Sequence, residues 1–145
     1  MISISVGSDH AGFAYKEAIK KFLTEKGYTV LDAGTDSEAS VDYPDYGRAA
    51  AELVANGTAN AGIIVCGSGI GISIAANKVH GIRAANVTSV EMAKLARAHN
   101  NANMLAVGSR LSSLDDVLLM VAAFLETSFE GGRHAGRVAK LDAMG

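Results

Sequence analysis

A chain of 145 residues with a net charge of −2 is long enough for one folded domain and offers no basic excess for binding nucleic acid or an anionic membrane. Hydrophobic residues make up 49% of the chain, which excludes an intrinsically disordered protein. The single cysteine cannot form a disulfide within the chain, the N-terminal residues do not resemble a signal peptide, and no apolar run is long enough to cross a bilayer. We therefore expect a cytoplasmic protein.

Strand-like and helix-like patterns alternate along the chain. Apolar runs predict strands at residues 2–6, 28–32, 62–66, 82–86 and 104–107. Helical periodicity and helix-start residues predict helices at residues 13–26, 44–56, 72–76, 88–99, 114–127 and 134–144. Two of these helices begin with capping-box patterns, Thr88 with Glu91 and Ser113 with Asp116. The alternation predicts an α/β fold in one domain, residues 1–145, whose parallel sheet is covered by helices on both faces.

Polar residues follow four of the predicted strands. In a parallel sheet the carboxyl ends of the strands meet at one edge, where such folds bind their ligands. The sequence therefore predicts a binding site at that edge. The clusters are Ser8-Asp9-His10, Asp42-Tyr43, Cys66-Gly67-Ser68 and Gly108-Ser109-Arg110.

A loop with alternating glycines, Gly67, Gly69 and Gly71, follows the third strand and its terminal Cys66. A strand, a glycine turn and a helix direct backbone N–H groups at an anion, which indicates a base or nucleophile beside an oxyanion site. A dinucleotide-binding loop is disfavoured because position 72 is isoleucine, and a nucleotide-triphosphate loop because no Gly-Lys-Ser/Thr follows. A structural turn with a buried cysteine is the remaining alternative.

Basic residues gather near the C-terminus. Arg133 and Arg137 are four residues apart, with His134 beside them, so they form either a phosphate clamp that Arg110 could join or a solvated basic tail. His99 is either a functional residue or a helix-ending histidine. Metal-ligand spacings such as HxxxH do not occur in the sequence, so we expect a reaction on a phosphorylated small molecule without a metal or cofactor.

These motifs resemble those of the type B ribose-5-phosphate isomerases, a family that also contains galactose-6-phosphate isomerase subunits and allose-6-phosphate isomerases. The resemblance covers nearly the whole chain in order. It rests on GSDHAG at 7–12, DYP at 42–44, CGSGIGISIAANK at 66–78, GIRA at 81–84, HNNAN at 99–103, GSR at 108–110 and EGGRH at 130–134.

The resemblance implies a three-layer αβα Rossmann-like sandwich with a five-stranded parallel sheet, flanking helices and a C-terminal helix. It implies a homodimer, or a tetramer built from it, with active sites made by both chains. It also implies interconversion of ribose 5-phosphate and ribulose 5-phosphate through an enediolate, a reaction of the pentose phosphate pathway. The same chemistry on a tetrose or hexose phosphate, or a phosphosugar- or nucleotide-binding module without turnover, remains an alternative.

Residue roles also follow from the resemblance. Cys66 would be the base, Ser68 would shuttle the hydroxyl proton, and His99 would help to open the sugar ring. Two departures from the family bear on these roles: Ser68 stands where threonine is common, and Ala75 stands where some members carry a glutamate base. The remaining residues would contact sugar oxygens (Asp9, Tyr43), hold the oxyanion through backbone amides (Gly67, Gly69, Ile70, Gly71), touch the intermediate (Asn100) or line the phosphate pocket (His10, Arg110, Arg133, His134, Arg137).

Overall fold

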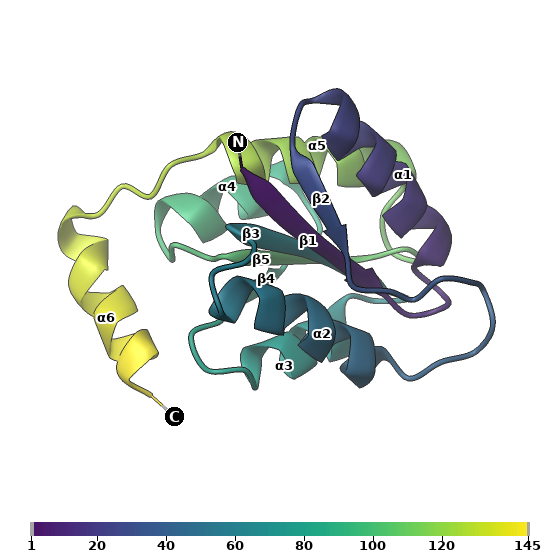
Figure 1. The fold of residues 1–145 in the computed structure, drawn as a ribbon. Helices are drawn as coiled ribbons and strands as arrows, with labels where there is room; N and C mark the ends of the chain where they lie inside the picture. The colour runs from purple at the N-terminus through teal and green to yellow at the C-terminus, as the bar shows by residue number, and fades with distance from the viewer. Residues whose placement is uncertain (1, 145) are drawn as a thin grey trace.

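The computed structural model describes residues 2–144, in which five strands alternate with helices (Figure 1). The strands are β1 (Ser3–Ser8), β2 (Thr29–Asp32), β3 (Ala61–Cys66), β4 (Ala84–Asn86) and β5 (Met104–Gly108). The helices are α1 (Phe13–Glu25), α2 (Tyr43–Ala55), α3 (Ile70–Asn77), α4 (Val90–Ala98), α5 (Leu114–Glu126), the short 3₁₀ helix η1 (Gly132–His134) and α6 (Ala135–Ala143).

The strands form one parallel sheet in the order β2-β1-β3-β5-β4, which confirms the predicted fold class. The chain passes from β1 to β2 on one side and then crosses back to β3 on the other side of β1. This reversal is a topological switch point at the carboxyl ends of β1 and β3, the place where ligands bind in such sheets. Ser8 pairs with Val65 there, and Cys66 pairs with Gly108 on the other side of β3.

Helices cover both faces of the sheet, and the buried side chains form two clusters (Figure 1). On one face, α1, α4 and α5 pack against the sheet through fully buried residues such as Leu23, Val117 and Phe124. On the other face, α2 and α3 pack through small residues such as Ala50 and through Ile72. Burying each large apolar side chain contributes about 1.5–3 kcal/mol, so these two layers hold the strand ends in place.

Helix ends follow the local sequence signals in most cases. After α1, Gly27 has a φ of 92°, and the Tyr28 N–H donates to the Leu23 carbonyl at 3.1 Å, which closes a Schellman motif. At the start of α5 the hydroxyl of Ser113 accepts from the Asp116 N–H at 3.2 Å, as predicted.

The predicted capping box at Thr88 is wrong, because the N-cap of α4 is Ser89. Its hydroxyl accepts from the Met92 N–H at 3.1 Å. The chain stays extended one residue longer than expected because the Val87 N–H donates to the Ala106 carbonyl of β5. Other boundaries differ as well: β1 continues to Ser8 instead of residue 6, β4 begins at Ala84 instead of residue 82, α3 begins at Ile70 instead of residue 72, and the C-terminal segment begins as η1 before α6.

Helix α6 stands away from the sandwich, on the side of the sheet where the strands begin (Figure 1). An ion pair of 2.7 Å between Arg83 and Asp142 connects it to the start of β4. Between α6 and this side of the sheet lies a groove of about 630 Å³, whose lining includes Asn100, Leu141 and Met144. No helix within residues 2–144 is both long and apolar enough to span a membrane.

Candidate active site

Cys66 lies at the carboxyl end of β3 and is 4% exposed. The backbone N–H of Gly69 donates to its Sγ at 3.1 Å. Gly69 is the N-cap of α3 and has a φ of 79°, a left-handed conformation that suits glycine. The sulfur thus accepts a hydrogen bond from a backbone donor at the N-terminus of α3.

Two amides of the glycine loop are already engaged by side chains. The Gly69 N–H binds Cys66, and the Ile70 N–H donates to the Ser68 hydroxyl at 3.1 Å. The first turn of α3 leaves further N–H groups at this edge, that of Gly71 among them.

The side chains of Arg110 and Tyr43 lie against the glycine loop. A methyl group on Gly67 would come within 2.9 Å of the Arg110 guanidinium, and one on Gly71 would come within 2.5 Å of the Tyr43 ring. The backbone reinforces this, since the Arg110 N–H donates to the Gly67 carbonyl at 2.9 Å. Residues from β5 and α2 therefore lie beside Cys66, as the strand-end clusters predict.

Asp9 and His10 follow β1 at the same edge. Asp9 is 7% exposed, and its carboxylate accepts from the Gly12 N–H at 3.1 Å. His10 Nδ1 accepts from the Val41 N–H at 3.2 Å, so a neutral ring carries its proton on Nε2. This bond also ties the β1 loop to the segment that leads into Tyr43.

A charge network around the buried Lys16, which the sequence did not reveal, braces this edge. Lys16 is 1% exposed, and its Nζ lies 2.7 Å from the Asp32 carboxylate at the end of β2. Asp32 also pairs with Lys20 and accepts from the Gly34 N–H, and the Gly34 carbonyl accepts from the Ser8 N–H. Burial raises the pKa of Asp32, but hydrogen bonds from Lys16 and Lys20 outweigh it and hold the pKa below 3.8.

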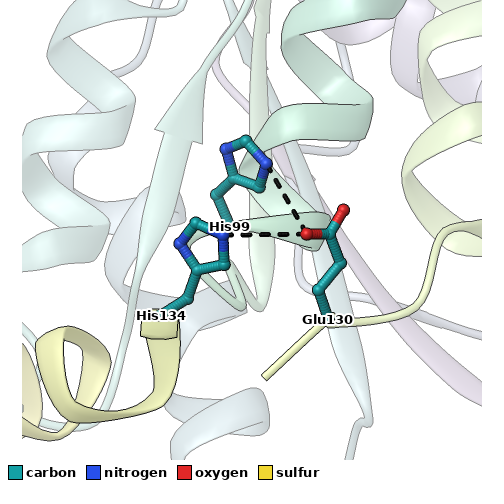
Figure 2. Close-up of side chains that lie close together, drawn as sticks. All are labelled: His99, Glu130 and His134. Atoms are coloured by element: carbon teal, nitrogen blue, oxygen red, sulfur yellow. Dashed lines mark ion pairs between the residues drawn. The ribbon is translucent and has the colours of Figure 1, made fainter. Parts of the chain in front are cut away.

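A second group of predicted residues lies near the C-terminal end of α4. His99 is the C-cap of α4, and its ring stacks on that of His134 with centroids 4.3 Å apart. Glu130, which was not predicted, places one carboxylate oxygen 3.8 Å from Nε2 of His99 and 3.7 Å from Nε2 of His134 (Figure 2). Partial burial and repulsion from His99, Arg133 and Arg137 lower the pKa of His134, against the opposing effect of Glu130.

Asn100, Arg133 and Arg137 are exposed close to these two histidines in the chain. Their segments adjoin the amino ends of the strands, since residues 99–103 lead directly into β5 and the Asn103 N–H donates to the Arg83 carbonyl before β4. Arg110 and Ser109 follow the other end of β5. A five-residue strand spans about 15 Å, so one chain keeps the two groups at opposite edges of the sheet.

Comparison with known proteins shows the family to which the chain belongs. A model of the family described as Ribose/Galactose Isomerase matches residues 4–141. The chain belongs to this family. It is 45% identical to ribose-5-phosphate isomerase B of Escherichia coli (strain K12), with 99% of this chain and 97% of that protein covered.

Two further proteins are similar to this chain over most of its length. The structure of ribose-5-phosphate isomerase B from Clostridium thermocellum is 51% identical, with a TM-score of 0.97 over 98% of this chain and 96% of that one. Galactose-6-phosphate isomerase subunit LacB of Clostridium acetobutylicum is 42% identical, with 94% of this chain and 79% of that protein covered. The matched region includes both edges of the sheet.

Proposed function

We propose that the chain is an aldose–ketose isomerase that interconverts ribose 5-phosphate and ribulose 5-phosphate. The observation that carries the proposal is the Cys66 sulfur at the switch point of the sheet, in contact with the N-terminus of α3. Abstraction of a proton beside a carbonyl requires a base and a nearby group that stabilises the developing oxyanion, and this edge offers both. Two relatives covered over nearly their whole length carry the ribose-5-phosphate isomerase B name.

In the proposed reaction, the Cys66 thiolate removes the proton from C2 of the open-chain aldose and returns it to C1. The enediolate oxygen accepts hydrogen bonds from loop amides, and Ser68 carries the hydroxyl proton between O2 and O1. Asp9 and Tyr43 orient the sugar oxygens. Because phosphate binding takes place away from the reacting carbons, it can position them without changing their chemistry.

We further propose that the active site forms between two copies of the chain. Cys66, Asp9, Ser68 and Arg110 lie at one edge of the sheet, whereas His99 lies at the other. A symmetric dimer would place the His99 edge of one copy over the Cys66 edge of its partner. Exposed apolar side chains on the helices around β4 support such an interface: Ile70, Ile74, Met92, Leu95, Leu141 and Met144.

In this dimer His99 would open the sugar ring, and Asn100 would touch the intermediate. The exposed arginines and His134, with Arg110 and His10 from the other copy, would bind the phosphate, since guanidinium groups bind its oxygens in pairs. A cytoplasmic location belongs to the same proposal because a reducing compartment keeps an unpaired catalytic thiol reduced.

A hexose phosphate is the second candidate substrate, and the similarity to the galactose-6-phosphate isomerase subunit supports it. This chain covers less of that protein than of the ribose-5-phosphate isomerase, which favours the pentose phosphate.

The test is isomerisation of erythrose 4-, ribose 5-, allose 6- and galactose 6-phosphate by the purified protein with EDTA present. We expect turnover of ribose 5-phosphate, and we expect Cys66→Ala to lower kcat by about 10³-fold or more while the variant stays folded. A Cys66→Ala variant with full activity would refute the assignment of the base. Activity on another sugar alone would change the substrate and keep the mechanism.

A further inference from the structure

The three side chains His99, Glu130 and His134 form a cluster that the proposed reaction uses only in part. One ligand-type atom from each lies within 4.8 Å of the others. Figure 2 shows that both imidazoles turn Nε2 toward the same Glu130 oxygen, which lies 3.8 Å from one and 3.7 Å from the other. These separations are too long for direct hydrogen bonds.

Backbone hydrogen bonds fix where the three residues sit. The His99 N–H donates to the Leu95 carbonyl at 2.9 Å, the Glu130 N–H to the Ala98 carbonyl at 3.0 Å, and the His134 N–H to the Gly131 carbonyl at 3.0 Å. Two segments more than 30 residues apart are therefore held together before any ligand arrives. The exposed side-chain fractions, 10% for His134, 37% for His99 and 59% for Glu130, leave the cluster open to water on the Glu130 side.

Two imidazole nitrogens and one carboxylate oxygen are a common ligand set for zinc with an open fourth position. Zinc–ligand bonds of about 2.0–2.2 Å in a tetrahedral site place ligand atoms roughly 3.3 Å apart. The present nitrogen–oxygen distances would therefore shorten by about 0.5 Å. The rings are stacked within 15° of parallel, so each must turn about its terminal torsion to aim Nε2 at the ion, and such torsions have broad minima.

We propose that His99, Glu130 and His134 bind a divalent transition-metal ion such as Zn²⁺, with water at the fourth position. Glu130 is the carboxylate of the site, and its charge offsets the nearby Arg133. As a consequence, which rests on the proposed function, the ion inhibits the isomerase. It occupies the Nε2 atoms of the two histidines that open the sugar ring and bind phosphate.

The direct test is calorimetric titration of the EDTA-stripped, dialysed full-length protein with zinc chloride. We expect one Zn²⁺ per chain. Glu130→Gln keeps the size of the side chain and removes its charge, and should weaken binding by about tenfold or more. Glu91→Gln makes the same charge change at the opposite end of α4 and should leave binding unchanged. Cys66→Ser should also leave it unchanged, since the thiol is not a ligand.

Isomerase activity provides the second readout. Zn²⁺ should inhibit the wild type and EDTA should reverse the inhibition. Glu130→Gln should require at least about tenfold more Zn²⁺ than the wild type for the same fractional inhibition. Absence of zinc binding, or equal binding by wild type and Glu130→Gln, overturns the proposal. If no sugar phosphate is turned over, the titration still decides the metal site, so the two proposals fail separately.

Discussion

The carboxyl edge of the sheet, where the strands end, differs in construction from the amino edge, where the strands begin. At the carboxyl edge, Cys66, Ser68 and Asp9 lie on short loops that main-chain hydrogen bonds, close glycine contacts and the Lys16–Asp32 pair hold together. At the amino edge, His99 and His134 meet through the long connection after α5, and their charged neighbours are exposed. The carboxyl edge is therefore preorganised within one chain, whereas we expect the amino edge to gain its final order from a partner and a phosphate.

This difference can be tested first at the carboxyl edge, where the largest effect on stability is expected. Gly69→Ala would force a side chain into a left-handed conformation and place its Cβ 2.8 Å from the Val107 backbone carbon. We expect a loss of about 2–3 kcal/mol in the free energy of unfolding, measured by chemical denaturation.

Gly136→Ala is the matched control at the other edge. A methyl group there meets nothing within 4 Å, and the residue lies inside α6. We expect a gain of about 0.5–1 kcal/mol. Equal losses from the two substitutions would contradict the difference between the edges.

Substitution of the buried Lys16 should have the next largest effect on stability. Lys16→Met leaves Asp32 with Lys20 as its remaining lysine partner. We expect about 2 kcal/mol of destabilisation, less than the roughly 3–5 kcal/mol typical of a fully buried pair, because the Asp32 side chain is 31% exposed. Lys20→Met removes the more exposed partner of the same carboxylate and should cost about 0.5 kcal/mol or less.

The pH dependence of stability tests the same pair. Because the pKa of Asp32 is lowered in the folded chain, its contribution is present above about pH 3.8 and is lost as the pH falls through the lowered pKa. The stability difference between wild type and Lys16→Met should therefore shrink below pH 3.8. A difference that stays constant down to pH 2 would show that packing, not charge, causes the loss.

The smallest effect on stability is expected at the amino edge. Arg137→Ala should raise KM for the phosphorylated sugar by about tenfold, with kcat and the unfolding free energy little changed, because the exposed guanidinium would contact only phosphate. Lys140→Ala removes the same charge one turn further along α6 and should leave KM unchanged. Similar KM values for both variants would favour the solvated basic tail.

The sequence predicted the features that local residue patterns determine. Gly27 and Ser113 end and begin helices where expected, and the polar residues after the strands meet at one edge because a parallel sheet aligns its carboxyl ends. Thr88 and Ser89 are adjacent and both able to cap, so the choice depended on pairing between Val87 and β5, which no local pattern encodes.

Contacts between distant segments could not be predicted from the sequence for the same reason. Glu130 and His99 are separated by the whole of β5 and α5, so no spacing rule connects them. Lys16 reads as one polar residue of an amphipathic helix, and only the fold shows that it is buried against Asp32. That His99 and Cys66 occupy opposite edges likewise appeared only once the strands were ordered.

Subunit complementation tests the shared active site most directly. Cys66→Ala and His99→Ala, each inactive alone, are mixed under conditions that exchange subunits. A mixed dimer would contain one site with both defects and one intact site, so random mixing should restore about one quarter of the wild-type activity. A mixture no more active than either variant would contradict an active site built from both chains.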